Sequence, residues 1–282
     1  MAAALEHWLP VMYTDTRQAI EIAQAAEAAG FTGIALADHV AMPMDFTSVH
    51  PSGERMVEPD GEFMDPFVVA SAMLAVTTRL RVMTYVYIVT MREPWSVAKG
   101  AGTLSLMSDG RFGLGVGAGW LLEEIQLLGF DPATRGKRMD ADLATIQQLL
   151  RTGRTDVGGT TVAMEPRPPK PTPIWVGGKS TAALRRAARY DGWLGMNYSL
   201  EETLERLDRL AELRAEDPRD RSGEMTLVLP MVEQTPALQE ELAGRGATAT
   251  LAMPWYPGDP ACAGIDAKRA AMEQWSSTFD LA

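Results

Sequence analysis

Residues 108–120 read Ser-Asp-Gly-Arg-Phe-Gly-Leu-Gly-Val-Gly-Ala-Gly-Trp, and this glycine-rich stretch decides between two α/β folds. It contains a GxGxxA match to the dinucleotide fingerprint, which in a Rossmann fold follows a strand and opens a helix. Here glycines alternate with larger residues over Phe112–Gly117, so the glycines belong to the strand itself. The Rossmann interpretation therefore fails, and a strand of a different parallel-sheet fold is expected.

Short apolar runs alternate with amphipathic stretches on both sides of this strand, which is the pattern of repeated βα units. Eight parallel strands with intervening helices close most simply into a (β/α)8 TIM barrel, and this α/β fold is predicted. Residues 1–282 are expected to form a single domain, the alternative being two halves joined at the proline-rich residues 166–173. The predicted strands are Leu5–Val11, Gly33–Ala37, Leu80–Val89, Phe112–Gly117, Ile174–Gly177, Trp193–Asn197, Thr226–Val232 and Thr248–Met253.

Local signals place helices between these strands. Asp15 is predicted to cap a helix that ends at Gly30, and Ser199 with Glu202 predicts a capping box. Two segments interrupt the pattern: a loop insertion at about 41–63, and an irregular stretch at 154–173 whose prolines forbid a helix. Because long loops in compact domains are usually functional, the first is predicted to be a lid or a binding loop.

Composition excludes several classes of partner. The net charge of −11 argues against binding to nucleic acid or to an anionic membrane. Cys262 is the only cysteine, so no intrachain disulfide forms, and His7, His39 and His50 are too scattered for a metal cluster. Neither a secretory signal nor an apolar run near the roughly 20 residues of a membrane span occurs, so a cytoplasmic location is predicted.

Barrel chemistry lies in the loops after the strands, and this rule selects the candidate residues. Asp38-His39 follow the second strand, where a histidine can protonate or orient a reacting ring because its charge changes near neutral pH. The alternative is a histidine that a neighbouring carboxylate satisfies and that merely closes the barrel top. The paired carboxylates Glu123-Glu124 are expected to lie on an ordinary solvated helix face.

Glycines mark two further candidate regions. Gly177-Gly178-Lys179-Ser180 follows the fifth strand, where free N–H groups at a helix start favour phosphate; the alternative is a plain turn with Ser180 as the N-cap. It is no P-loop, because Pro173 stands where that motif needs a glycine. The glycines of residues 113–117 suggest a flat ligand pressed against the strand, with Trp120 either stacking on that ligand or lying in the core.

The motifs and their order along the chain resemble those of the bacterial luciferase-like monooxygenase family, and most closely its coenzyme F420-dependent oxidoreductase branch. The resemblance covers about residues 5–255 and implies a luciferase-like barrel with F420, or alternatively FMN, across its C-terminal mouth. The motifs that carry it are Asp38-His39, residues 80–86 (Leu-Arg-Val-Met-Thr-Tyr-Val), residues 108–120, Arg135-Gly136-Lys137-Arg138, and residues 173–178 with 182–188 and 191–193.

The resemblance also implies roles for single residues. His39 would lie near the reactive part of the deazaflavin with Asp38 supporting it, and a bulge with a non-prolyl cis peptide at Tyr85–Val86 would back the ring. Tyr85 departs from the small residue usual there. Trp120 replaces the acidic residue of the family's sugar-phosphate dehydrogenases, so glucose 6-phosphate is not expected as substrate. The residues expected at the cofactor are Thr84, Tyr85, Val86, Ala118, Gly119, Trp120, Gly177, Gly178, Lys179 and Ser180.

The function predicted is hydride transfer between F420 and an unidentified small organic substrate. The first alternative is an FMN-dependent monooxygenase that uses reduced flavin and O2. A cofactor-free barrel and a metal-dependent hydrolase are weaker alternatives, the latter because metal ligands are almost absent from the strand ends. Dimers are common in the family, which allows a homodimer, although no residue of the sequence specifies an interface.

Overall fold

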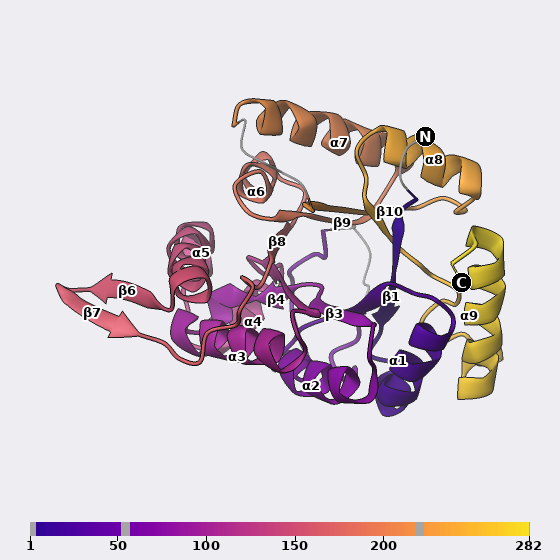
Figure 1. Ribbon diagram of the computed structural model, residues 1–282, viewed down its shortest axis with the longest axis horizontal. Coiled ribbons are helices and arrows are strands. Elements are labelled where there is room, and N and C mark those ends of the chain that lie inside the picture. The colour runs from indigo at the N-terminus through magenta and orange to yellow at the C-terminus, as the bar shows by residue number, and fades with distance from the viewer. Residues whose placement is uncertain (1–3, 52–56, 218–222, 282) are drawn as a thin grey trace.

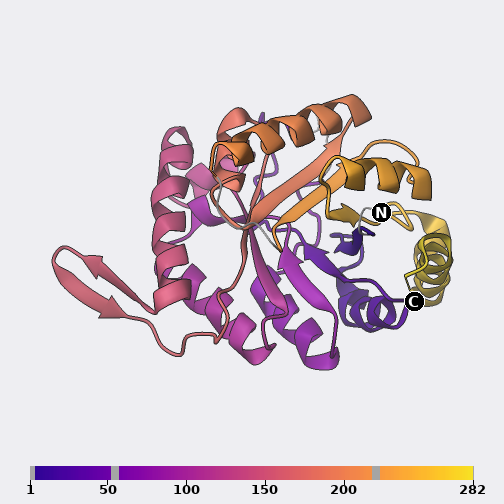
Figure 2. The ribbon, with the colours of Figure 1, turned by 45° about the horizontal axis from the view of Figure 1, so that its top comes forward.

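The computed structural model describes residues 4–51, 57–217 and 223–281, and a closed ring of parallel strands forms its centre (Figure 2). Strand β1 pairs with β11, and β3 pairs with β5, which closes the sheet. The predicted (β/α)8 barrel is therefore confirmed. Its strands are β1 (Glu6–Val11), β2 (Gly33–Leu36), β3 (Arg81–Thr84), β4 (Tyr87–Ile88), β5 (Phe112–Gly117), β8 (Ile174–Gly177), β9 (Gly192–Tyr198), β10 (Met225–Pro230) and β11 (Ala249–Leu251).

Helices cover the outside of the ring (Figure 1). The capping box of Ser199 and Glu202 is present, and Gly30 follows the first helix with a φ of +83°. The capping role predicted for Asp15 is wrong: its buried carboxylate forms an ion pair with Lys268 at 2.6 Å instead. The helices are α1 (Ala19–Ala28), α2 (Pro66–Val76), α3 (Pro94–Met107), α4 (Leu122–Leu127), α5 (Arg135–Thr152), α6 (Thr181–Ala187), α7 (Leu200–Ala215), α8 (Pro236–Gly244) and α9 (Ile265–Phe279), with short 3-10 turns at Thr16–Gln18, Val89–Met91, Pro132–Thr134 and Pro260–Cys262.

The third strand is interrupted between β3 and β4. Met83 pairs with Gly113, and Tyr87 pairs with Val116, so four steps along this strand oppose three steps along β5. One extra residue on one strand is the definition of a β-bulge. The Tyr85–Val86 peptide bond within it is cis, as the resemblance implied.

The segment predicted to be irregular at 154–173 contains an antiparallel hairpin, so that prediction was wrong for its first half. Strands β6 (Arg154–Val157) and β7 (Thr160–Ala163) are joined by two glycines with positive φ, at residues 158 and 159. A Gly-Gly pair between two short strands is a known hairpin signal. The hairpin projects from the barrel in both ribbon views (Figures 1 and 2).

Large side chains fill the inside of the ring, and the glycines of β5 make room for them. A Cβ atom at residue 113 would lie 2.1 Å from the ring of Trp175, and one at residue 115 would lie 2.0 Å from the carbonyl oxygen of Thr84. The interpretation that a flat ligand presses on this part of the strand is therefore wrong. Neighbouring strands occupy that space, with Trp8, Met83, Trp175, Leu194 and Leu227 in one buried cluster.

The replacement Gly113→Ala should lower the free energy of unfolding by about 1–3 kcal/mol, because the Trp175 ring must move out of a packed interior. Gly244→Ala is the matched control, since nothing lies within 4 Å of a Cβ there and the helix α8 gains a better helix former. Chemical denaturation of both variants measures the difference. Equal stability of the two would contradict this account of the strand.

Acid should destabilise the fold through His7. This residue of β1 is buried, and its Nδ1 accepts a hydrogen bond from Nε1 of Trp275 at 3.0 Å. Burial lowers the pKa of His7 to about 4, so between pH 6.5 and 4 the unfolded chain holds a proton that the folded chain does not. Stability should fall as pH is lowered through this window, by up to about 3 kcal/mol. Denaturation curves at pH 7 and pH 4 measure the loss of stability, which should be smaller for the His7→Gln variant than for the unmodified chain. An equal loss in both would refute the role given to His7.

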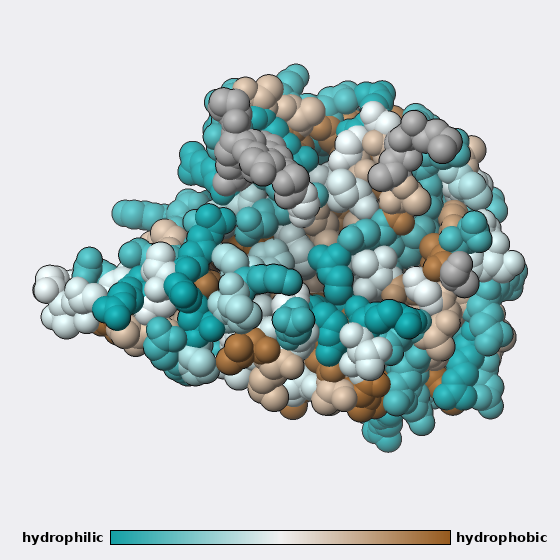
Figure 3. Space-filling view, viewed as in Figure 1, coloured by the Kyte–Doolittle hydropathy of each residue, from teal (hydrophilic) through white to brown (hydrophobic). Residues whose placement is uncertain are grey.

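The surface view is largely hydrophilic, and hydrophobic residues gather along its lower edge over α2 and α3 (Figure 3). These helices expose Val68, Val76, Leu106 and Met107. Among the described residues, no helix combines the length and the apolar character that a membrane span needs.

Candidate functional site

The barrel brings four separate segments to one rim. Asp38-His39 follow β2, Tyr85-Val86 lie between β3 and β4, residues 118–120 follow β5, and residues 177–180 begin at the end of β8. Because all these strands are parallel, their carboxyl ends meet at the same end of the barrel. A Cβ atom at residue 177 would lie only 2.8 Å from the side chain of Val86. The segments that the sequence analysis singled out therefore share one end of the molecule.

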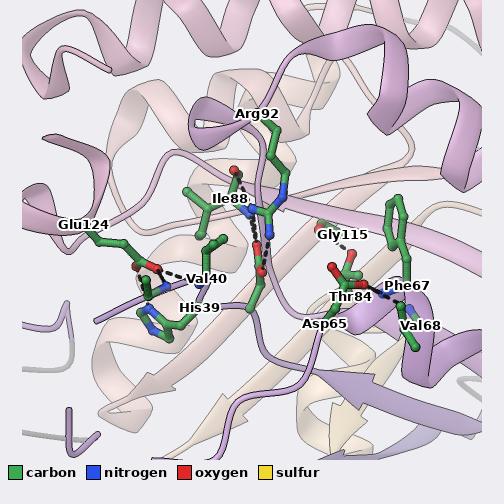
Figure 4. A network of polar contacts seen from close by, with 12 residues as sticks. His39, Val40, Asp65, Phe67, Val68, Thr84, Ile88, Arg92, Gly115 and Glu124 are labelled. Carbon is green, nitrogen blue, oxygen red and sulfur yellow. Dashed lines mark hydrogen bonds and ion pairs between the residues drawn. The ribbon is translucent and has the colours of Figure 1, made fainter. Parts of the chain in front are cut away.

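His39 is held in place by Glu124 of α4 (Figure 4). Nδ1 of His39 lies 2.8 Å from Oε2 of Glu124, and the two side chains are 9% and 2% exposed. The other carboxylate oxygen accepts the backbone N–H groups of Val40 at 2.6 Å and Ala41 at 3.1 Å. One buried carboxylate thus fixes both the imidazole ring and the backbone that follows it.

The solvated helix face predicted for Glu123-Glu124 is wrong. Burial alone would raise the pKa of Glu124, but the hydrogen bonds from His39, Val40 and Ala41 lower it below its ordinary value. Glu123 accepts hydrogen bonds from Thr47 and Ser48, through the backbone N–H and the hydroxyl group of each. These bonds outweigh burial and lower the pKa of Glu123 to about 2. Glu123 and Glu124, which are consecutive on α4, therefore hold two parts of the long loop by hydrogen bonds, residues 47–48 and residues 40–41.

An ionised Glu124 determines the tautomer of His39. A carboxylate can only accept hydrogen bonds, so Nδ1 must carry the proton that it shares with Glu124. In the neutral ring Nε2 then carries a lone pair, and it has no hydrogen-bond partner among the residues that the structure describes. Nε2 is therefore the atom of His39 that can accept a proton, and the carboxylate of Glu124 lies at Nδ1 on the other side of the ring.

Asp38 does not contact His39 through any hydrogen bond in the described part of the chain. Its carboxylate forms two hydrogen bonds with the guanidinium group of Arg92, each 2.8 Å long, and accepts the N–H of Ile88 at 2.8 Å (Figure 4). Burial raises the pKa of Asp38, and the charge of Arg92 opposes that effect. Asp38 therefore joins the end of β2 to the end of β4, and Glu124 is the carboxylate that supports His39.

The contacts made by Glu124 and Arg92 were not predicted from the sequence. Leu121, Ile125 and Leu128 repeat at helical spacing, and the same face of α4 includes Glu124. That periodicity could have shown that Glu124 is buried. Arg92 lies 54 residues from Asp38, and no local pattern signals their pairing.

Thr84, Tyr85 and Val86, which are expected at the cofactor, lie at the carboxyl end of β3 and in the bulge that follows it. The hydroxyl of Thr84 is completely buried and donates to the carbonyl oxygen of Gly115 at 2.7 Å. The hydroxyl of Tyr85 donates to the carbonyl oxygen of Gly195 on β9, and burial raises the pKa of this phenol well above its ordinary value. Tyr85 thus spans the inside of the barrel, and both Tyr85 and Val86 are partly exposed.

Trp120 is half-buried and belongs to an aromatic cluster at the rim. Its ring lies edge-on to His39, Phe46 and His50, at centroid distances of 5.9, 5.8 and 5.2 Å. Burial, with a smaller contribution from the charge of Lys179, lowers the pKa of His50 to about 4. At neutral pH this cluster therefore surrounds His39 with an uncharged imidazole and apolar rings. Ala118 and Gly119 lead into it, both partly exposed.

The segment 177–180 has the features of a strand-to-helix turn. Ser180 caps α6 by accepting the N–H of Ala183 at 3.2 Å, and Gly178 has a φ of +119° that other residues rarely adopt. Nζ of Lys179 donates to the carbonyl oxygen of Pro51 at 2.6 Å. Lys179 and Ser180 are exposed at the rim, so backbone and side-chain donors are accessible there.

The rim suits a planar organic cofactor better than a metal ion. Within the described residues, no group of three or more His, Cys, Asp or Glu side chains could hold a metal. The rim does offer aromatic edges, a partly exposed bulge at residues 85–86 and an open glycine turn. Flat rings with a polar tail are bound by such combinations of apolar walls and a few polar groups.

Comparisons with known proteins agree with this architecture. The sequence profile of the family described as luciferase-like monooxygenase matches residues 4–272. The uncharacterized protein Rv0940c of Mycobacterium tuberculosis is 38% identical over 210 residues, which cover 71% of this chain and 73% of that protein. Pyrimidine monooxygenase RutA of Rhizobium rhizogenes is 32% identical over 137 residues, 45% of this chain and 38% of RutA.

Solved structures show the same fold at lower identity. An F420-dependent secondary alcohol dehydrogenase, in complex with an F420-acetone adduct, has a TM-score of 0.66 at 20% identity and covers 80% of this chain and 68% of its own. The oxygenating constituent of 3,6-diketocamphane monooxygenase from Pseudomonas putida, in complex with FMN, has a TM-score of 0.61 at 14% identity, over 80% and 67%. Monooxygenase RslO1 from Streptomyces bottropensis has a TM-score of 0.66 at 17% identity, over 98% and 89%.

Proposed function

Because the chain belongs to the luciferase-like monooxygenase family, we propose that it transfers a hydride between coenzyme F420 and a small organic substrate. The observation that carries the proposal is His39, which the buried Glu124 holds at the rim with Nε2 free to exchange a proton. The family match at residues 4–272 also supports the proposal that the chain acts as one domain.

Three groups of residues would hold the cofactor. Its ring would lie against Tyr85-Val86 and residues 118–120, and its phosphate would approach residues 177–180, where Gly178 leaves the backbone open. When bound, F420 supplies the two-electron chemistry, as the acceptor or donor of hydride. The chain supplies orientation, the exclusion of water by the aromatic cluster at Trp120, and the movement of a proton.

His39 performs the proton step in this proposal. In the oxidation of a substrate hydroxyl group, Nε2 accepts the hydroxyl proton while the adjacent carbon loses its hydride. The imidazolium that forms is stabilised by the carboxylate of Glu124, which is 2.8 Å from Nδ1. In the reverse direction Nε2 returns the proton to the oxygen. Asp38 and Arg92 keep β2 and β4 in register beneath this group.

Titration of the purified chain with F420 and with FMN, followed by fluorescence, tests the cofactor assignment. Tight binding of F420 and weak binding of FMN are expected, and tight binding of FMN alone would refute the assignment. Gly178→Val should weaken F420 binding because it closes the turn, with a Cβ atom 3.0 Å from Ala183. Gly158→Val is the control, since that glycine also has a positive φ but lies in the hairpin that projects from the barrel.

A second candidate function is an FMN-dependent monooxygenase that uses reduced flavin and O2. The similarity to pyrimidine monooxygenase RutA favours it. In this case His39 would stabilise negative charge near the ring in place of moving the substrate proton. Mass spectrometry of the product formed from a substrate, reduced FMN and ¹⁸O₂ distinguishes the two proposals, because a monooxygenase places labelled oxygen in the product and hydride transfer does not.

A further inference from the structure

Glu123 holds the long loop after β2 against the start of α4. Its Oε1 accepts hydrogen bonds from the backbone N–H of Thr47 at 2.8 Å, from the hydroxyl of Thr47 at 2.9 Å and from the N–H of Ser48 at 3.1 Å. Its Oε2 accepts the hydroxyl of Ser48 at 2.6 Å, and the oxygen of that hydroxyl accepts the N–H of Leu122 at 3.1 Å. Because hydrogen bonds to an ionised carboxylate are about twice as strong as neutral ones, residues 47–48 are firmly bound to α4.

The bound residues 47–48 lie between two rings of the aromatic cluster. Phe46 directly precedes them, and His50 follows two positions later. Both rings pack edge-on against Trp120, at centroid distances of 5.8 and 5.2 Å, and Trp120 in turn packs edge-on against His39 at 5.9 Å. The hydrogen bonds of Glu123 therefore connect, through the loop and one tryptophan, to the imidazole at the rim.

The loop has few other means of holding these rings in place. Residues 40–51 form neither helix nor strand, so no ladder of backbone hydrogen bonds fixes them. Met44 and Val49 are 69% and 71% exposed, so they add little burial. Lys179 makes one further contact at the end of the loop. Ordering a loop costs conformational entropy for every residue, and the bonds to Glu123 offset that cost at its centre.

We propose that Glu123 is a positioning residue for the proposed reaction: it holds Phe46 and His50 against Trp120, and this cluster is the wall along which a substrate reaches His39. The inference rests on the proposed function of the rim and adds a residue to it. Glu124 holds the proton-accepting ring itself. The consecutive acids of α4 would thus serve different parts of one site.

Kinetics should separate the two acids. Glu123→Ala leaves the bond between Glu124 and His39 in place, so Nε2 still exchanges its proton. Losing the wall weakens binding equally before and during the reaction, so KM should rise about fivefold or more while kcat changes less than about twofold. For Glu124→Gln the opposite is expected, a lower kcat with little change in KM.

Histidine ring signals in NMR test the inference without cofactor or substrate. Burial lowers the pKa of His50 to about 4, so its imidazole should stay neutral from about pH 5.5 to 8 in the unmodified chain. Glu123→Ala should release His50 to solvent, and its ring should then titrate within this range. Removing a nearby negative charge would by itself lower the pKa of His50, and the cation of Lys179 acts in the same direction. A raised pKa therefore reports exposure of the ring.

Three controls accompany the titration. Glu201→Ala removes a carboxylate from the second position of α7, as Glu123→Ala does from α4, but Glu201 makes no side-chain hydrogen bond within the described part of the chain. His50 should remain neutral in that variant. Glu123→Gln should also keep His50 neutral, because the amide oxygen can accept the bonds of Oε1 and the NH2 group can donate to Ser48. His7, buried on β1 with a pKa lowered to about 4, should stay neutral throughout and reports an intact fold.

The inference is overturned if His50 stays neutral in Glu123→Ala, if it titrates equally in Glu201→Ala, or if KM is unchanged when His50 is released. If His7 titrates in Glu123→Ala, the fold is disturbed, and the double variant Thr47→Val with Ser48→Ala decides instead. That variant removes both hydroxyl donors without altering α4, and a neutral His50 there also overturns the inference.

Failure of this inference differs from failure of the proposed function. A neutral His50 in Glu123→Ala, together with normal turnover of the unmodified chain, refutes the role of Glu123 alone. A released His50 without any F420-dependent turnover of the unmodified chain refutes the proposed function.

Discussion

Replacing Arg92 with Met should lower the free energy of unfolding by about 3–5 kcal/mol, because it leaves a buried carboxylate without its partner. Asp38 is 3% exposed, and both of its oxygens are bound by the guanidinium group at 2.8 Å. Water cannot replace that partner at such a buried position. Equilibrium denaturation in urea at pH 7 measures the loss.

Two controls separate the loss of the partner from the loss of a charge. Arg245→Met removes an arginine from the exposed pair with Asp208, at 2.7 Å, and should cost no more than about 1 kcal/mol. The double variant Asp38→Asn with Arg92→Met should recover part of the stability lost in Arg92→Met. Similar small losses in all three variants would contradict the role given to the Asp38–Arg92 pair.

Replacing His39 with Ala should reduce turnover by about 10²–10⁴-fold while cofactor affinity changes little, because the variant loses a positioned proton acceptor but no wall of the ring site. Absorbance of the cofactor follows the rate, with a substrate that the unmodified chain oxidises or reduces. Added imidazole should restore part of the rate in the His39→Ala variant. Full turnover without His39 would exclude it as the proton carrier.

Glu124 acts through His39, and Glu124→Gln tests that action. The amide oxygen can accept from the N–H groups of Val40 and Ala41 only if its NH2 group faces the imidazole. Nδ1 of His39 must then accept, and the proton moves to Nε2. The kcat should fall with little change in KM, and ¹⁵N NMR should show the opposite tautomer. An unchanged tautomer with lost activity would indicate a merely structural role.

The barrel could be predicted from the sequence because its strands are buried on both faces. Such strands appear as short continuous apolar runs, as in residues 174–177, and all eight were found within a few residues. The hairpin at residues 154–163 escaped prediction because its strands are exposed and polar, and because the prolines after it dominated the pattern.

The site was predicted only in part. Position after the strands sufficed to predict that His39 and the turn at 177–180 lie at the same rim, since parallel strands end there. The partners of these groups depend on contacts between distant segments: Glu124 reaches His39 across 85 residues. The glycines of β5 were misinterpreted for the same reason, because the side chain that fills the space over Gly113 comes from another strand.

A crystal structure of the chain with F420 bound would locate the ring. We expect the ring to lie against Tyr85–Val86 at the C-terminal rim, with Nε2 of His39 within about 3.2 Å of a polar atom of the ring or of a bound substrate analogue. A ring bound elsewhere on the molecule, or one at the rim with His39 still beside Glu124 but turned away from every reacting atom, would contradict it.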